Sequence, residues 1–162
     1  MVVHPNGGGY VGVNVKIDSS VFVGIHAVIL DNAIIEGDVR IEDDAVIRGN
    51  AKIKGNVRIS GNSEIYGPVK ISGEVQIDGN VIISGKAVLM DRVIVTEKAQ
   101  IYGNARVYND AIVRGNAHVC GSARVYEHAI ISGDAAVGGM ARVLGRAIVK
   151  GTETVRANEV RS

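Results

Sequence analysis

The stretch from Gly103 to Lys150 decides the fold. Divided into sixes, it reads GNARVY, NDAIVR, GNAHVC, GSARVY, EHAIIS, GDAAVG, GMARVL and GRAIVK. The third residue of every hexad is alanine, and the fifth is valine or isoleucine. Strict recurrence at a fixed period is typical of repeat architectures, in which each repeat packs against its neighbours.

The same frame extends well before this stretch. It runs without insertion or deletion through 23 hexads from Val13 to Lys150, with Ala, Val or Ser third and Ile, Val or Leu fifth. Apolar residues two apart indicate a strand with one buried face. The first position is most often Gly, with Asp, Asn, Glu or Ser as substitutes, and Gly and Asn tolerate the positive φ of a tight corner. Because strands this short cannot stand alone, we predict an all-β fold, a parallel β-solenoid.

The outward-facing fourth position predicts the size of one coil. At an 18-residue step it gives a basic series, an isoleucine series and a mixed series: Lys52, Lys70, Val88, Arg106, Arg124 and Arg142; Ile94, Ile112, Ile130 and Ile148; Val46, Glu64, Ile82, Gln100, His118 and Ala136. Basic residues separate from isoleucines only if three hexads close one coil. We therefore predict a three-sided prism with about 18 residues per coil and seven to eight coils, stacked about 4.8 Å apart.

The two ends depart from the repeat. Residues 1–12 are expected to form a lead-in, with Tyr10 and Val11 docked on the first turn of the helix over residues 13–150. In residues 151–162, Glu153 and Glu159 stand where alanine is expected. A carboxylate in a narrow apolar interior is costly, so this segment is expected to be a C-terminal cap or tail.

Composition narrows the functional classes. The net charge is +1, which does not favour a nucleic-acid partner. The single cysteine permits no intrachain disulfide and is compatible with a reducing compartment. The first residues lack the pattern of a secretory signal, and no apolar run reaches the roughly 18 residues of a membrane span. We expect a cytoplasmic protein with no membrane partner.

The repeat resembles the hexapeptide-repeat, left-handed β-helix proteins. Their pattern is an aliphatic residue, then Gly, Ala, Glu or Asp, two free positions, a small residue and one more. Residues 107–112 (VYNDAI) align with the aliphatic residue at Val107 and the small residue at Ala111, although glycine recurs one place later than in the family pattern. The GNARVY variant and the GGGYV lead-in resemble bacterial acyltransferase-like proteins. Left-handedness is implied by this resemblance alone.

The resemblance also implies a function and an assembly. Members pack as homotrimers and bind acyl-CoA between subunits, with a histidine as base. The γ-class carbonic anhydrases share the fold and bind zinc through three histidines at subunit boundaries. Here the four histidines, His4, His26, His118 and His128, do not have that spacing, and a zinc site needs three or four ligands. We expect no metal and no resident cofactor, with acyl-CoA remaining a potential substrate.

The isoleucine series is the first candidate site. Ile94, Ile112, Ile130 and Ile148 point outward in register and predict a contiguous apolar strip. Soluble monomers tend to avoid such strips, although β-branched residues also favour strands in general. We interpret the strip as the interface of a homo-oligomer.

The basic series is the second candidate site. Arg106, Arg124 and Arg142 stack at coil spacing, with Tyr108 and Tyr126 beside them. Like charges about 4.8 Å apart repel by roughly 1 kcal/mol in water-like surroundings. Solvent, counter-ions or acids of a neighbouring subunit could offset this repulsion. The alternative is a small anionic ligand such as a nucleotide, held by arginine and packed on tyrosine.

The third candidate is the pair His118 and Cys120, with Gln100 and Tyr102 one coil below. Histidine can act as a general base and cysteine as a nucleophile, but no oxyanion hole is recognisable. Three hypotheses therefore stay open. They are a non-catalytic oligomeric scaffold or binding module, an acyl-CoA-dependent acyltransferase with His118 as base, and a binder of a small anion between subunits.

Overall fold

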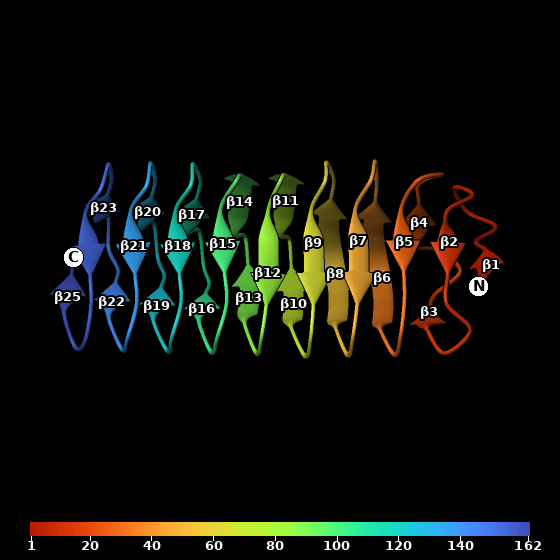
Figure 1. Cartoon of the computed structure of the whole chain (residues 1–162), viewed down its shortest axis with the longest axis horizontal. Coiled ribbons are helices and arrows are strands. Elements are labelled where there is room, and N and C mark those ends of the chain that lie inside the picture. Colours follow the sequence, from red (N-terminus) through yellow and green to blue (C-terminus); the bar gives the residue numbers. More distant parts are fainter.

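The computed structural model describes all 162 residues and contains 25 strands and no helix. Strands of successive coils pair in parallel at an 18-residue offset, as in Arg106↔Arg124, Ile112↔Ile130 and His118↔Ala136. This register confirms the three-sided β-solenoid predicted from the sequence, which makes about eight turns. In Figure 1 the near strands run downward and the far strands upward while the coils advance from right to left, so the coil is left-handed.

The prism has three faces, which we number in chain order. Face 1 is a 10-stranded sheet. Its strands are β1 (Val2–Val3), β2 (Tyr10–Val11), β5 (Val28–Ile29), β7 (Val46–Arg48), β9 (Glu64–Tyr66), β12 (Ile82–Ser84), β15 (Gln100–Ile101), β18 (His118–Val119), β21 (Ala136–Val137) and β24 (Thr154–Val155). Its strands are nearest the viewer in Figure 1.

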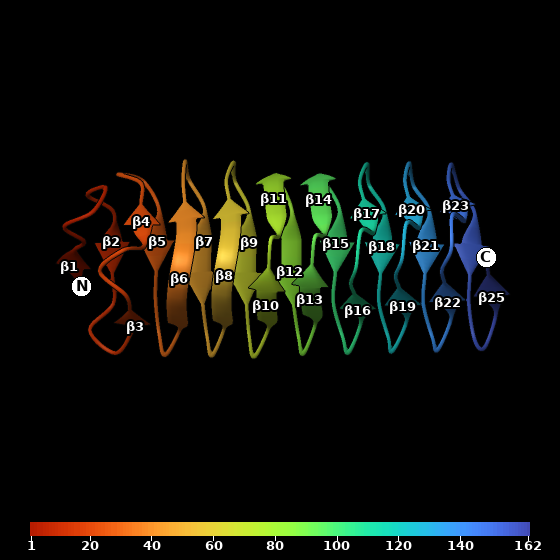
Figure 2. The ribbon, with the colours of Figure 1, turned by 180° about the vertical axis from the view of Figure 1, so that it is seen from behind.

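Faces 2 and 3 share one 15-stranded sheet, seen from its own side in Figure 2. Face 2 holds β3 (Lys16–Ile17), β10 (Lys70–Gly73), β13 (Val88–Asp91), β16 (Arg106–Val107), β19 (Arg124–Val125), β22 (Arg142–Val143) and β25 (Val160–Arg161). Face 3 holds β4 (Phe22–Val23), β11 (Gln76–Gly79), β14 (Ile94–Glu97), β17 (Ile112–Val113), β20 (Ile130–Ile131) and β23 (Ile148–Val149). The long strands β6 (Ile34–Ile41) and β8 (Lys52–Ile59) turn the corner between the two faces and join them.

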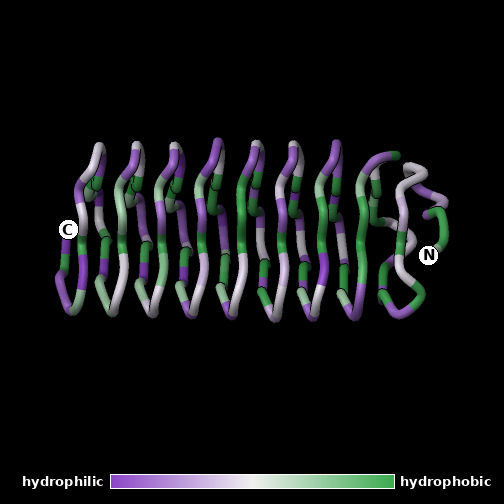
Figure 3. Tube along the Cα trace, in the orientation of Figure 1, coloured by the Kyte–Doolittle hydropathy of each residue, from purple (hydrophilic) through white to green (hydrophobic).

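The interior is a column of small and medium aliphatic side chains. The core holds 44 buried hydrophobic residues, and every one of them occupies the third or fifth position of a hexad. Figure 3 shows the resulting alternation of hydrophobic and hydrophilic segments along each coil. One polar residue enters the column, and its hydroxyl is satisfied, because Ser63 Oγ donates to the carbonyl oxygens of Ser60 at 2.7 Å and Gly79 at 3.2 Å.

The corners confirm the role expected of the first hexad position. From Asp31 to Ala157 every first residue has a positive φ, and seven of these residues are not glycine. Four of the five acidic ones, all except Glu97, also accept a hydrogen bond from the same corner one coil later. Asp43 Oδ2 accepts the N–H of Gly61 at 2.9 Å, and Glu127 Oε2 accepts that of Gly145 at 2.7 Å. Corner carboxylates thus link successive coils, which the sequence pattern does not reveal.

The termini follow the coil path. Tyr10 pairs with Val28 in β5, so the coil begins within the lead-in, and β1 lies antiparallel on β2. In residues 151–162, β24 pairs with β21 and β25 pairs with β22, in register. Glu153 and Glu159 are both exposed on this last coil and avoid the cost of burial. No helix is present that is long and apolar enough to cross a membrane.

Candidate functional site

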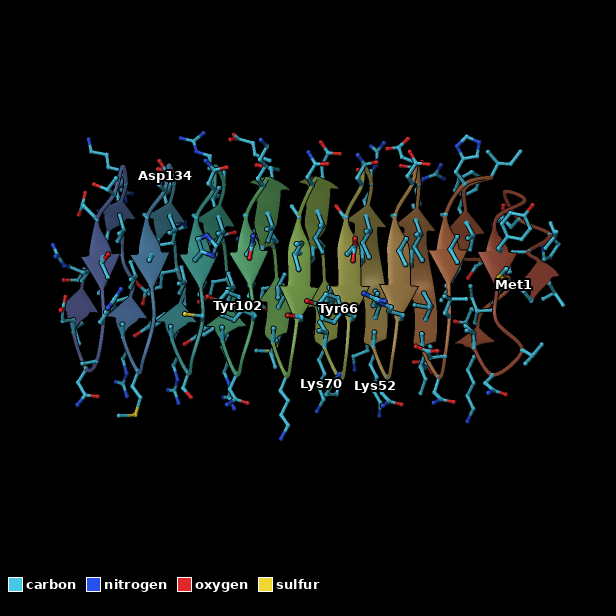
Figure 4. The ribbon with its side chains drawn as sticks, in the orientation of Figure 1. Met1, Lys52, Tyr66, Lys70, Tyr102 and Asp134 are labelled. Atoms are coloured by element: carbon cyan, nitrogen blue, oxygen red, sulfur yellow. The ribbon has the colours of Figure 1, made fainter.

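Face 2 carries a row of cations, which we call the basic row: Lys52, Lys70, Arg106, Arg124 and Arg142. Strand pairing puts its members in register, with Val88 between the lysines and the arginines. All five are exposed, and Figure 4 places Lys52 and Lys70 along the lower edge of the prism. The structure therefore forms the basic series that the sequence predicted.

The arginines of the basic row have no carboxylate partner. No ion pair involves Arg106, Arg124 or Arg142. Four of the eight arginines elsewhere do find a partner: for example, Arg92 Nε lies 2.7 Å from Asp110 Oδ1, and Arg48 Nη2 lies 3.6 Å from Glu64 Oε2. Repulsion along the row, about 1 kcal/mol for each neighbouring pair in water, is therefore not offset within the chain.

An aromatic column runs beside the basic row. The rings of Tyr108 and Tyr126 are parallel, with centroids 4.9 Å apart and planes 2° apart. Burial, followed by the neighbouring Tyr126, raises the pKa of Tyr108, and the nearby arginines lower it only in part. Its hydroxyl stays neutral at physiological pH and can donate a hydrogen bond.

Face 2 is also hollowed near its lysines. A hollow of about 450 Å³ is lined by Lys52, Lys54 and Lys70, by the polar side chains of Glu36 and Ser72, and by apolar side chains that include Met90. The hollow lies at the N-terminal end of the basic row. The hollow is open, so it offers charge and contact area without enclosing a ligand.

Face 3 carries the isoleucine ladder, which is Ile94, Ile112, Ile130 and Ile148 in register on four successive coils. The first three are half-buried and Ile148 is 56% exposed. A shallow hollow of about 590 Å³ runs along Ile94, Ile112 and Ile130. The structure thus confirms a contiguous outward strip, while its role as an interface stays a prediction.

A polar rim borders the isoleucine ladder at the corner between faces 2 and 3. The carboxylate of Asp110 contacts two basic side chains. Arg92 Nε lies 2.7 Å from its Oδ1, and His128 Nδ1 lies 3.6 Å from its Oδ2. His128 is largely exposed, as is His26, which meets Asp44 at 3.5 Å. Both histidines are therefore corner residues beside a carboxylate.

His118 lies on face 1, away from the basic row. Its ring meets the ring of Tyr102 edge-on, with centroids 6.3 Å apart and an angle of 84°. The neighbouring Cys120 side chain, followed by burial, raises the pKa of the Tyr102 hydroxyl. The predicted neighbours of His118 are thus brought together. However, His118 takes part in no ion pair with a carboxylate that could orient it as a base.

No metal centre is formed by the side chains. No three His, Cys, Asp or Glu residues come together in an arrangement that could hold an ion. Cys120 is a free, partly exposed cysteine.

A carboxylate fork on face 3 was missed by sequence reasoning. Glu42 Oε1 accepts Arg40 Nη2 at 2.8 Å, and Glu42 Oε2 accepts Arg58 Nε at 2.7 Å. The sequence did carry a signal for this fork, because Arg40 and Arg58 are 18 residues apart and Glu42 follows Arg40 by two residues. The pKa of Glu42 is lowered, first by the hydrogen bond from Arg40 and then by the contacts with Arg58. Burial raises this pKa, but by less than the two arginines lower it.

This fork gives a pH-dependent prediction. A carboxyl whose pKa is lowered by folding stabilises the fold above its unfolded pKa of about 4.3 and loses that effect as pH falls through the folded pKa. Glu42→Gln should therefore lower the free energy of unfolding by about 1 kcal/mol at pH 7, and by less at pH 3. Urea unfolding at both pH values measures this difference. Glu36→Gln, an exposed position without an ion pair, is the control; an equal loss there would contradict the prediction.

Comparison with known proteins supports the repeat assignment. Residues 99–115 match the model of the YdcK beta solenoid repeat. No curated protein matches the chain. The solved structures that match include a hexapeptide transferase family protein from Anaplasma phagocytophilum, which is 16% identical with a TM-score of 0.34, over 92% of this chain and 78% of that one.

Two further solved structures are UDP-N-acetylglucosamine acyltransferases. The one from Campylobacter jejuni is 15% identical with a TM-score of 0.39, over 93% of this chain and 69% of that chain. The one from Arabidopsis is 18% identical with a TM-score of 0.44, over the same shares. The match at residues 99–115 agrees with the β-solenoid seen in the structure. Acyltransferases are among the solved structures to which the chain is similar.

Proposed function

We propose that this protein is a non-catalytic β-helix scaffold that assembles with copies of itself through face 3. The isoleucine ladder is the observation that supports this proposal. Its four side chains form one strip along the coil axis, and nothing in the chain folds over them. Burying a fully exposed isoleucine contributes about 1.5–3 kcal/mol, and Ile94, Ile112 and Ile130 are already partly buried, so each contributes at most about a third as much on association.

The rest of face 3 also suits an interface between rigid subunits. At the rim, Asp110 is already paired with Arg92 and lies beside His128, so these groups can stay at the wet edge of a contact. An apolar centre with a polar rim is the usual anatomy of a protein interface. The resemblance to hexapeptide-repeat proteins favours three subunits.

The surroundings of His118 favour a structural role over catalysis. Acyl transfer would need a base aimed at a bound acceptor, but the ring of His118 packs edge-on against Tyr102. Three surface hollows exceed 400 Å³. They lie beside the basic row, the isoleucine ladder and Phe22, and none of them is lined by His118. The coil also carries no inserted loop that could close over a substrate, and substrate sites are usually concave.

The test is a charged substitution in the isoleucine ladder. Ile112→Asp places a carboxylate at the centre of the strip, where association would bury it at a cost of several kcal/mol. We expect this variant to sediment as a monomer while the parent sediments as an oligomer. The isolated fold should survive, because the side chain of Ile112 points outward.

The matched control is Ile82→Asp. Ile82 occupies the same hexad position on face 1 and is half-buried like Ile112. The control variant should keep the parent's sedimentation coefficient. Equal dissociation in both variants, or in neither, would contradict the assignment of face 3 as the interface.

A further inference from the structure

The basic row stands out because it is a one-sided accumulation of charge on an almost neutral protein. Between residues 52 and 144, the outward fourth and sixth positions of face 2 hold six lysines and arginines and no aspartate or glutamate. The whole chain has a net charge of +1. The charge is therefore segregated onto one face, which concentrates the positive potential there.

The geometry of the row suits an extended ligand better than a compact one. The side chains stand in line with the coil axis on neighbouring strands, about 4.8 Å apart, with one gap at Val88. From Lys52 to Arg142 the row spans five coils, or roughly 24 Å. A compact anion on this open face would touch one or two cations. A linear chain of anionic groups would touch all five, and the contacts would reinforce one another.

The aromatic column narrows the class of polyanion. The ring faces of Tyr108 and Tyr126 pack on each other at 4.9 Å, so they leave no gap in which a nucleobase could stack. Both tyrosines are half-buried in the face, so they do not project as anchors into a bilayer. What they offer a ligand is a shallow apolar edge with a hydroxyl, which can hydrogen-bond to a sugar hydroxyl.

We propose that face 2 binds a linear anionic polysaccharide, carboxylated or sulfated, which lies along the coil axis on the basic row. The arginines bind its carboxylate or sulfate groups with paired N–H donors. The tyrosine column contacts the rings and hydroxyls between these groups. This site is on a different face from the isoleucine ladder, so the proposal stands or fails separately from self-assembly.

The test is binding of full-length protein to two probes, heparin as a sulfated chain and polygalacturonate as a carboxylated chain, measured by calorimetric titration at several salt concentrations. We expect at least one probe to bind, with an affinity that falls steeply with salt because counter-ions are released. Neutral dextran should not bind, and sodium sulfate should not compete beyond its effect as a salt. The probe that binds identifies the acidic group.

The variant Arg106→Gln/Arg124→Gln should weaken binding about tenfold or more and reduce the salt dependence by about two charges. The control Arg114→Gln/Arg146→Gln removes the same charge from exposed arginines outside face 2 and should change affinity less than twofold. Comparable weakening in both variants would overturn the proposal, as would the absence of binding at low salt. Tighter binding of single-stranded DNA or of anionic vesicles than of either polysaccharide would also overturn it.

Discussion

Replacing Ile83 by alanine is expected to lower the free energy of unfolding by about 2–5 kcal/mol. Ile83 is fully buried in β12, where its side chain fills one layer of the narrow interior. The loss combines the removed apolar surface with a cavity that cannot collapse, because hydrogen bonds to the coils on either side hold the backbone in place. The interior has no bulky side chain that could move in, since the chain contains no tryptophan and one phenylalanine.

The neighbouring residue supplies the control for this prediction. Ile82 has the same chemistry in the same strand but points outward and is half-buried, so Ile82→Ala should cost about 1 kcal/mol or less. Denaturant unfolding of the two variants measures the difference. Equal losses would contradict the assignment of the fifth hexad position to the interior and the fourth to the surface.

Replacing Gly85 by valine is expected to destabilise the protein by about 2–4 kcal/mol. Gly85 is a first-position corner with φ of +69°, and a Cβ there would lie 2.8 Å from the carbonyl oxygen of Gly103 one coil later. A β-branched side chain is strained at positive φ and would also force the two coils apart. The effect should appear as a lower midpoint in thermal unfolding.

Asparagine at the same corner is the matched control. Asn109 has φ of +59° at an equivalent corner, where its Oδ1 accepts the N–H of Glu127 at 3.3 Å. Gly85→Asn should therefore cost less than Gly85→Val, about 1–2 kcal/mol, because asparagine shares the Cβ contact but tolerates this conformation and can make the same hydrogen bond. If valine and asparagine were equally harmful, steric contact alone would account for the glycine, and positive φ would not.

Much of the fold could be predicted from the sequence because the hexad fixes both the buried positions and the coil length. The arginines at 106, 124 and 142 and the isoleucines at 112 and 130 fall on separate faces only for an 18-residue coil, and the structure pairs them in that register. Handedness did not follow from the period, because six residues per side would also suit a right-handed coil.

The contacts that depend on side-chain rotamers could not be predicted. The coil step placed Tyr108 beside Tyr126, but whether their rings stack depends on torsion angles that the period does not restrict. The fork at Glu42 and the corner hydrogen bonds of Asp43 and Glu127 likewise need the direction of a side chain as well as its register. The oligomeric state could not be predicted either, because a repeat shows which face is apolar but does not show what covers that face.

The most direct test of the proposed scaffold is the molar mass of the unmodified protein in solution, measured by sedimentation equilibrium across micromolar concentrations. One chain has a mass of 17.0 kDa. Self-assembly through the isoleucine ladder predicts a whole-number multiple of this mass, with three the expected multiple. A mass of 17.0 kDa at every concentration would contradict it, because face 3 would then remain exposed to water.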